Sequence, residues 1–120
     1  MTEKEASKRY DLEDRCLIFA KDIIALVNLA PKTLANTEII KQLIRSAGSV
    51  GANYIEANGA LGKQDFVMRA RICRKEARES KFWLNLITVG REALENKRQA
   101  LIQESDELAK IFGAIIEKSK

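Results

Sequence analysis

The sequence predicts an all-α protein, a single domain over residues 1–120 that folds as an antiparallel up-down-up-down four-helix bundle. The 120 residues, 46% hydrophobic and 32% charged, suit one soluble globular domain. One proline, six glycines and seven aromatic residues are too few for a β-sandwich or barrel. Apolar residues recur instead at helical spacing in four segments that are rich in helix-forming residues.

The first two helices are expected at about residues 12–29 and 38–58. Asp11 precedes the first apolar position and can act as the N-cap of the first helix. Asn36 or Thr37 can cap the second helix in the same way. The second helix carries very few charged residues for a solvent-facing helix, so it is either central to the bundle or in contact with another subunit.

The third and fourth helices are expected at about residues 63–88 and 96–118. Gly90 lies in the connection between them, and Asn96 with Gln99 forms a weak capping box. Four amphipathic helices joined by short connections favour the bundle.

The residue types argue against several functions. There is no histidine, which removes the commonest general base and the commonest metal ligand. Cys16 and Cys73 are expected to be reduced core residues, with a disulfide or a metal role as the alternative. No apolar run is long enough to span a membrane, and the first residues lack the apolar core of a signal peptide. We therefore expect a cytoplasmic protein that is not an enzyme, with no cofactor, no metal, no membrane partner and no small-molecule substrate.

The glycine-rich stretch at residues 48–62 raises the question of a phosphate-binding loop. Gly62-Lys63 is followed by Gln64, and Ala57 stands where a P-loop requires glycine. The stretch fits helix packing better, with a helix stop at its end and a turn into the third helix. Its small residues predict close backbone packing against the third helix or another subunit, and they are Ala47, Gly48, Gly51 and Ala52.

The third helix divides into three stripes. One has the spacing of a core seam and consists of Phe66, Ala70, Cys73, Ala77, Ser80 and Leu84. The second mixes apolar residues with carboxylates, which indicates a protein interface or a widened core edge; it contains Met68, Ile72, Glu76, Glu79, Trp83 and Leu86.

The third stripe is basic and comprises Arg71, Arg74, Lys75, Arg78 and Lys81. Residues 63–81 contain seven basic and three acidic residues, so their net charge of +4 equals that of the whole chain. Such local basicity is typical of a surface that binds a phosphate backbone. The alternative is a solvated helix face that serves solubility or an acidic partner.

Residues 43–84 also carry a family-like pattern. The run RSAGSVGANYIEA is similar to R-S-x-x-S-I-x-x-N-I-A-E-G, KQDF to a basic S-K-K-[DE]-F helix start, and RESKFWL to N-E-L-E-T-x-L. The pattern resembles the four helix bundle protein family, also called 23S ribosomal RNA intervening-sequence proteins. The matching residues are Arg45, Ser46, Ser49, Asn53, Glu56, Gly59, Lys63, Asp65, Phe66, Glu79 and Leu84. Two departures, at 55–57 and at 75–76, fit a divergent or basic subgroup.

The resemblance implies an all-α bundle that assembles as a homopentamer and has no established catalytic residues. The related accessory variability determinants of diversity-generating retroelements bind nucleic acid through a basic pentamer surface. We therefore expect a homo-oligomer that binds RNA or DNA, with RNA favoured, through the basic stripe. The alternative is a structural or protein-interaction oligomer without nucleic-acid binding.

The oligomer interface is expected to involve Arg45, Glu56, Met68, Ile72, Glu79 and Trp83. Arg45 and Glu56 share one face of the second helix, and Glu79 lies on the interface stripe of the third. These charges can form salt bridges between subunits, or they can belong to a partly exposed polar face of one chain.

Overall fold

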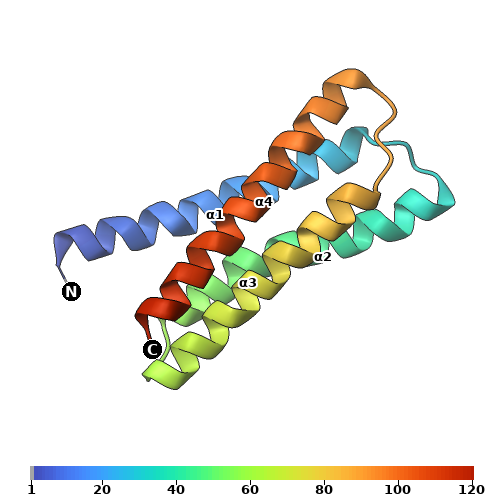
Figure 1. Ribbon diagram of the computed structural model, residues 1–120. Coiled ribbons are helices and arrows are strands. Elements are labelled where there is room, and N and C mark those ends of the chain that lie inside the picture. Colours follow the sequence, from blue (N-terminus) through green and yellow to red (C-terminus); the bar gives the residue numbers. More distant parts are fainter. Residues whose placement is uncertain (1) are drawn as a thin grey trace.

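The computed structural model describes residues 2–120, and for residues 4–10 only the backbone. Within this range the chain forms helices and no strand (Figure 1), and the helices are α1 (Glu3–Leu29), α2 (Leu34–Asn58), α3 (Lys63–Leu86) and α4 (Glu92–Lys118). None of these described helices is long and apolar enough to cross a membrane.

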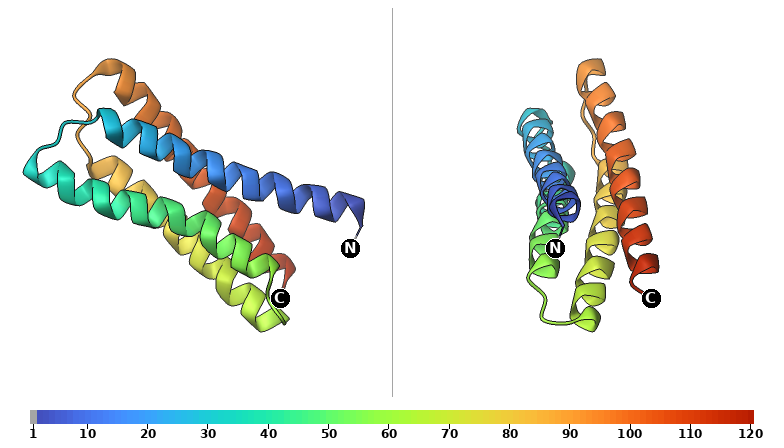
Figure 2. Two further views of the ribbon diagram at one scale, coloured as in Figure 1. Left: turned by 180° about the vertical axis from the view of Figure 1, so that it is seen from behind. Right: turned by 90° about the vertical axis from the view of Figure 1, so that its left-hand side faces the viewer.

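The four helices run up-down-up-down around one core. Among the described residues, the backbone of each helix comes close to its two neighbours in the bundle, α1 to α2 and α4, and α3 to α2 and α4. The contact between α2 and α3 is the most extensive, and the contact between α1 and α4 is the least extensive. Figure 2 shows the N-terminal end of α1 projecting beyond the other helices, in a molecule that measures 46 × 23 × 19 Å. The predicted four-helix bundle is therefore confirmed.

The core is formed by the apolar face of each helix. Phe19, Leu43, Leu84 and Phe112 are among the fully buried side chains, one from each helix. The rings of Tyr54 and Phe112 meet edge to face with centroids 5.6 Å apart, which joins α2 to α4 across the core. Five of the six predicted seam residues of α3 are buried, and Phe66 is half-buried at the end of the seam.

The first helix begins at Glu3 and not near residue 12, so Asp11 lies inside α1 and is not its N-cap. Leu12 is the first described core residue of this helix. The sequence argument followed apolar spacing, which marks only the part of a helix that packs on the core. It therefore missed the helical turns of α1 that precede Leu12.

The cap of α2 also differs from the prediction. Thr33 is the N-cap, and its Oγ1 accepts a hydrogen bond from the Asn36 backbone N–H at 3.1 Å. The Asn36 side chain is buried and donates through Nδ2 to the carbonyls of Pro31 and Thr88, at 2.9 and 2.6 Å. Its Oδ1 accepts from the Thr88 N–H at 3.1 Å. Asn36 thus joins the α1–α2 connection to the α3–α4 connection.

Helix α4 begins at Glu92, four residues earlier than predicted. Gln99 donates to the carboxylate of Glu95 at 3.0 Å, so the predicted capping box with Asn96 is wrong. Gly90 has a φ of +76°, a left-handed conformation that glycine adopts without strain, and α3 ends before it at Leu86.

Only one of the two interior glycines of α2 makes a close contact. A Cβ on Gly51 would lie 3.2 Å from the Cβ of Cys16, so α2 approaches α1 closely at this position. A Cβ on Gly48 would meet no atom within 4 Å. At Gly51 the close approach is therefore made to α1.

Both cysteines are buried free thiols. Burial raises the pKa of Cys16 and of Cys73 to about 12. No Cα of α1 lies within 8 Å of a Cα of α3, whereas a disulfide needs a Cα separation below about 7 Å. These two residues are therefore too far apart for a disulfide in this fold, and Cys73 instead donates to the Val50 carbonyl at 3.3 Å.

Candidate nucleic-acid interface

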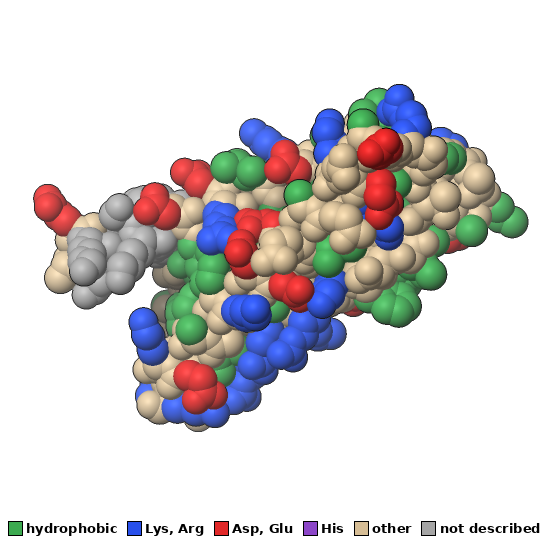
Figure 3. Space-filling view, turned by 45° about the horizontal axis from the view of Figure 1, so that its top comes forward, with side chains coloured by type: hydrophobic (Ala, Val, Ile, Leu, Met, Phe, Trp, Pro, Cys, Tyr) green, Lys and Arg blue, Asp and Glu red, His purple; other side chains and the backbone are tan. Residues whose placement is uncertain are grey.

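The basic stripe lies on the side of α3 that faces away from α2. Arg71, Lys75 and Arg78 are exposed, and none of them forms a hydrogen bond or an ion pair with the described part of the chain. Figure 3 shows a run of Lys and Arg side chains along the lower edge of the molecule. Three unpaired cations within about two helical turns form a continuous positive surface.

Arg74 lies where α3 meets α4. It is half-buried, and its Cδ lies 4.0 Å from the position that a Cβ on Gly113 would occupy. A hydrogen bond from Lys120 is the main cause that lowers the pKa of the Glu117 carboxyl, and the charge of Arg74 contributes. Arg74 thus adds charge to the stripe while its alkyl stem lies close to α4.

Lys81 is the member of the stripe that is neutralised. Its Nζ lies 2.9 Å from Oδ1 of Asp106 on α4, in a partly exposed salt bridge. The sequence spacing placed Lys81 in line with the other cations but gave no information on Asp106. The candidate interface therefore consists of Arg71, Arg74, Lys75 and Arg78.

Two of the three acidic residues of α3, Glu76 and Glu79, lie on the opposite side of the helix, against α2. Arg45 donates to the Glu76 carboxylate at 3.1 Å and also forms an ion pair with Glu79. The Glu76 side chain is only 7% exposed, whereas that of Arg45 is 48% exposed. Trp83 Nε1 donates to the same oxygen of Glu79 at 2.9 Å. These contacts form one polar network between α2 and α3 within a single chain.

Two hydroxyls extend this network into the core. The Oγ atoms of Ser46 and Ser80 lie 2.8 Å apart, and both residues are fully buried. Each hydroxyl has one proton, so one serine donates to the other and the accepting serine donates to a backbone carbonyl, either Ser80 to Glu76 at 2.9 Å or Ser46 to Leu43 at 3.2 Å. Each hydroxyl therefore has a partner, as buried polar groups require.

Two of the predicted interface residues, Arg45 and Glu56, lie on α2, and the other four lie on α3. Arg45, Glu79 and Trp83 belong to the α2–α3 network, in which Arg45 and Glu79 pair within one chain. Glu56 is exposed on α2, and Met68 is 47% exposed on α3. Their contact with another subunit stays a prediction.

Glu76 as the buried partner of Arg45 was not predicted. The sequence does contain a signal for this pairing in the register of the helical hairpin, because the turn at residues 59–62 folds α3 back onto α2. Arg45 lies 14 residues before this turn and Glu76 lies 14 residues after it. Antiparallel neighbours at equal distance from a turn lie side by side.

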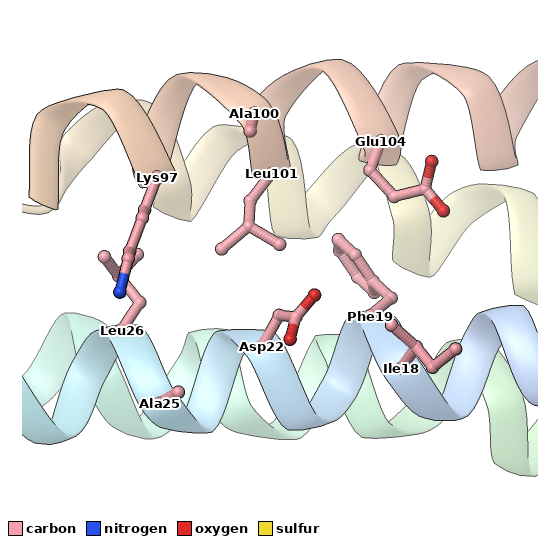
Figure 4. Close-up of a pocket in the computed structure, with 9 residues that line it drawn as sticks. All are labelled: Ile18, Phe19, Asp22, Ala25, Leu26, Lys97, Ala100, Leu101 and Glu104. Atoms are coloured by element: carbon pink, nitrogen blue, oxygen red, sulfur yellow. The ribbon is translucent and has the colours of Figure 1, made fainter.

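A hollow with a cavity volume of about 410 Å³ lies between α1 and α4. Phe19, Leu26 and Leu101 form its apolar wall, and Figure 4 shows the Asp22 carboxylate pointing into the space between the helices. Glu104 at its edge is held by Arg15, whose Nε donates at 2.7 Å. Its described lining holds no hydroxyl or thiol, and its ionisable side chains are those of Asp22, Lys97 and Glu104.

Two comparisons with known proteins agree with this architecture. The family model described as "23S rRNA-intervening sequence protein" matches residues 8–114. A crystal structure of a protein of unknown function from the S23 ribosomal protein family of Bacteroides thetaiotaomicron is 31% identical. It aligns with a TM-score of 0.74 and covers 87% of this chain and 96% of that chain. No curated protein matches the chain. With a family model that spans most of its length and a bundle of the same shape, the chain belongs to the 23S rRNA-intervening sequence protein family.

Proposed function

We propose that this chain is a non-enzymatic RNA-binding protein whose basic stripe on α3 holds phosphate groups. The observation that carries the proposal is the separation of charge on α3. Glu76 and Glu79 are paired with Arg45 on the α2 side, so they do not neutralise the cations on the outer side. Arg71, Lys75 and Arg78 are thereby left to solvent as a surface of one sign.

RNA is favoured over DNA because the name of the matching family refers to ribosomal RNA. Contacts from lysine and arginine to phosphates position a nucleic acid but carry no sequence information. We therefore expect binding that depends strongly on salt and weakly on sequence. With about three phosphate contacts per chain, affinity should fall by about 20- to 40-fold between 50 and 200 mM salt.

The test is a titration of labelled RNA and DNA oligonucleotides, followed by fluorescence anisotropy at both salt concentrations. Arg71→Glu with Arg78→Glu should weaken binding by about tenfold for each reversed charge. The matched control is Lys21→Glu with Lys41→Glu, on exposed positions of α1 and α2, which lowers the net charge from +4 to 0 in the same way. Equal loss in both double variants, or no binding by the parent protein at 50 mM salt, would refute the proposal.

A second candidate function, self-association, is favoured by apolar side chains exposed on the outer faces of α1 and α2. Leu17 and Ile24 lie seven residues apart on one face of α1, and they are 52% and 46% exposed. Ile44 and Ile55 share one face of α2 and are 41% and 57% exposed. A homo-oligomer would bury such residues. The family resemblance suggests a pentamer, which would also repeat the basic stripe around the assembly.

Native mass spectrometry tests this second candidate. A pentamer would have five times the 13.5 kDa mass of one chain. Leu17→Glu with Ile55→Glu should reduce the mass to that of a single chain, whereas the charge reversals on α3 should leave it unchanged. A monomeric parent protein would exclude self-association. An oligomer that binds no RNA or DNA would instead support a structural or protein-interaction role.

A further inference from the structure

We propose that a groove at the N-terminal half of α3 accepts one unstacked base of a single-stranded RNA whose phosphates lie on the basic stripe. The inference rests on the proposed function and adds a ligand class to it, namely single strands as opposed to duplexes. It is carried by the composition of the groove, by its charge and by its continuity with the stripe.

The groove has a cavity volume of about 580 Å³, which is within the range of sites that hold small organic ligands. Its surface is mostly apolar, with the side chains of Val67, Met68 and Ile72 along α3. Val67 and Ile72 are half-buried, and Met68 is 47% exposed. A thioether and two branched side chains make an apolar surface on which a flat base can lie.

Every charged side chain that lines the groove is basic. Lys63, Arg71 and Lys75 border it on α3, and Lys120 borders it at the other end of the chain. The first three form no hydrogen bond or ion pair with any described residue, and Lys120 pairs with Glu117 at 2.8 Å. An apolar surface surrounded by cations is complementary to a nucleotide, which combines an apolar face with a phosphate.

The groove is continuous with the stripe because Arg71 and Lys75 belong to both. These two residues are one turn apart, about 6 Å along the helix axis, and Arg78 follows about 4.5 Å further on. A strand that follows the three cations therefore passes the mouth of the groove. The Gln64 amide and the Ser119 hydroxyl also line the groove. The amide can donate to or accept from the edge of a base, and the hydroxyl, which donates to the Ile115 carbonyl at 2.8 Å, can accept.

The preference for single strands follows from where the bases lie. In a duplex the bases are stacked and paired inside the helix, so the apolar surface of the groove gains no contact from them. A single strand can turn a base outward and place its face on an apolar surface. In this proposal the side chains of Met68 and Ile72 contact the nucleic acid and do not contact another copy of the chain.

The experiment compares the affinity of the protein for a single-stranded RNA with its affinity for a duplex of the same length, at the same salt concentration. The parent protein should bind the single strand about fivefold or more tightly, the lower end of the range for stacking of one base. Met68→Ser should remove most of this difference by weakening single-strand binding alone. The matched control is Leu29→Ser, which removes an apolar side chain of similar exposure from α1. A single strand that carries 4-thiouridine should crosslink to a peptide containing residues 67–72.

The outcomes separate this inference from the function on which it rests. Equal affinity for single strand and duplex, with binding still lost on reversal of Arg71 and Arg78, overturns the groove assignment and leaves RNA binding intact. An equal effect of Met68→Ser on both RNAs also overturns it. If the parent protein binds neither RNA but binds phosphatidylserine vesicles in a Met68-dependent way, both proposals fail and the groove belongs to a lipid.

Discussion

The charged side chains on the two long sides of α3 differ in whether they are paired. On the side against α2, Glu76 and Glu79 share the guanidinium of Arg45, and a buried pair of serine hydroxyls continues the network into the core. On the outer side, Arg71, Lys75 and Arg78 extend into solvent without a described partner. One helix thus uses its anions to pack on its neighbour and leaves most of its cations on the surface.

The difference shows why the net charge of a helix underestimates the charge of one of its faces. Residues 63–81 have a net charge of +4, but two of their three carboxylates are turned away from the stripe. The positive potential outside α3 is therefore set by the unpaired cations. The inner side is expected to determine stability and the outer side to determine binding. Three experiments test this division, and a further one compares a packed with an open position on α2.

Arg45→Ala should have the largest effect on the inner side. It leaves the Glu76 carboxylate, only 7% exposed, without its cation, while the half-exposed position of Arg45 moderates the cost. We expect a loss of about 2 kcal/mol of unfolding free energy and a fall of about 8 °C in Tm, measured by circular dichroism. Arg78→Ala on the outer side is the matched control and should change stability by less than about 0.5 kcal/mol. Equal effects of the two variants would contradict the division.

Ser80→Ala should cost about 1 kcal/mol in urea denaturation, because it removes a buried hydrogen bond to Ser46. Ser46 can still donate to the Leu43 carbonyl, which limits the loss. The double variant Ser46→Ala with Ser80→Ala should cost less than the two single costs added together, since the hydroxyls are partners. Strict additivity would show that the pair does not interact in solution.

The two glycines of α2 offer the same contrast between a packed and an open position. Gly48→Ala places a methyl group in open space and should stabilise the helix by about 1 kcal/mol. At Gly51 the methyl group would meet Cys16 at 3.2 Å, and overpacking there should offset or exceed this gain. Thermal unfolding of the two single variants measures the difference. If Gly51→Ala is the more stable of the two, α1 and α2 are not packed closely at this point.

Asp106→Asn should have the smallest effect. It frees Lys81 from a salt bridge whose side chains are 41% and 37% exposed, so stability should change by less than about 0.5 kcal/mol. The freed cation extends the stripe, so the affinity for RNA at 50 mM salt should rise about twofold. Asp14→Asn, at an exposed position on α1, makes the same change in net charge and should leave binding unchanged. A comparable gain in both variants would indicate a general effect of net charge.

Helical periodicity was sufficient to predict the number, order and approximate bounds of the helices. It did not predict the first residues of α1, α2 and α4, because caps and solvent-exposed turns do not depend on apolar spacing. Asn36 illustrates this limit: its residue type suits an N-cap, but Thr33 takes that role and the amide is used between two connections. A contact across 52 residues leaves no local signal in the sequence.

The candidate site was predictable in outline. The positions of Arg71, Lys75 and Arg78 on one face follow directly from the helical repeat. The pairing of Lys81 with Asp106 depends on how far α4 is shifted along α3, which the sequence does not specify. The groove beside the stripe also required the structure, because it combines residues from the start of α3 with the last residues of the chain.

The Asn36 link has a mechanical consequence for the whole bundle. Because its side chain holds the α1–α2 connection to the α3–α4 connection, the outer helices α1 and α4 are anchored at the same end of the molecule. They are also the pair of neighbouring helices in least contact. Away from this link, Arg15 joins α1 to α4 through ion pairs with Glu104 and Glu107 at 2.7 and 2.9 Å. A separation of α1 from α4 would have to break these ion pairs, whereas the two connections would stay joined through Asn36.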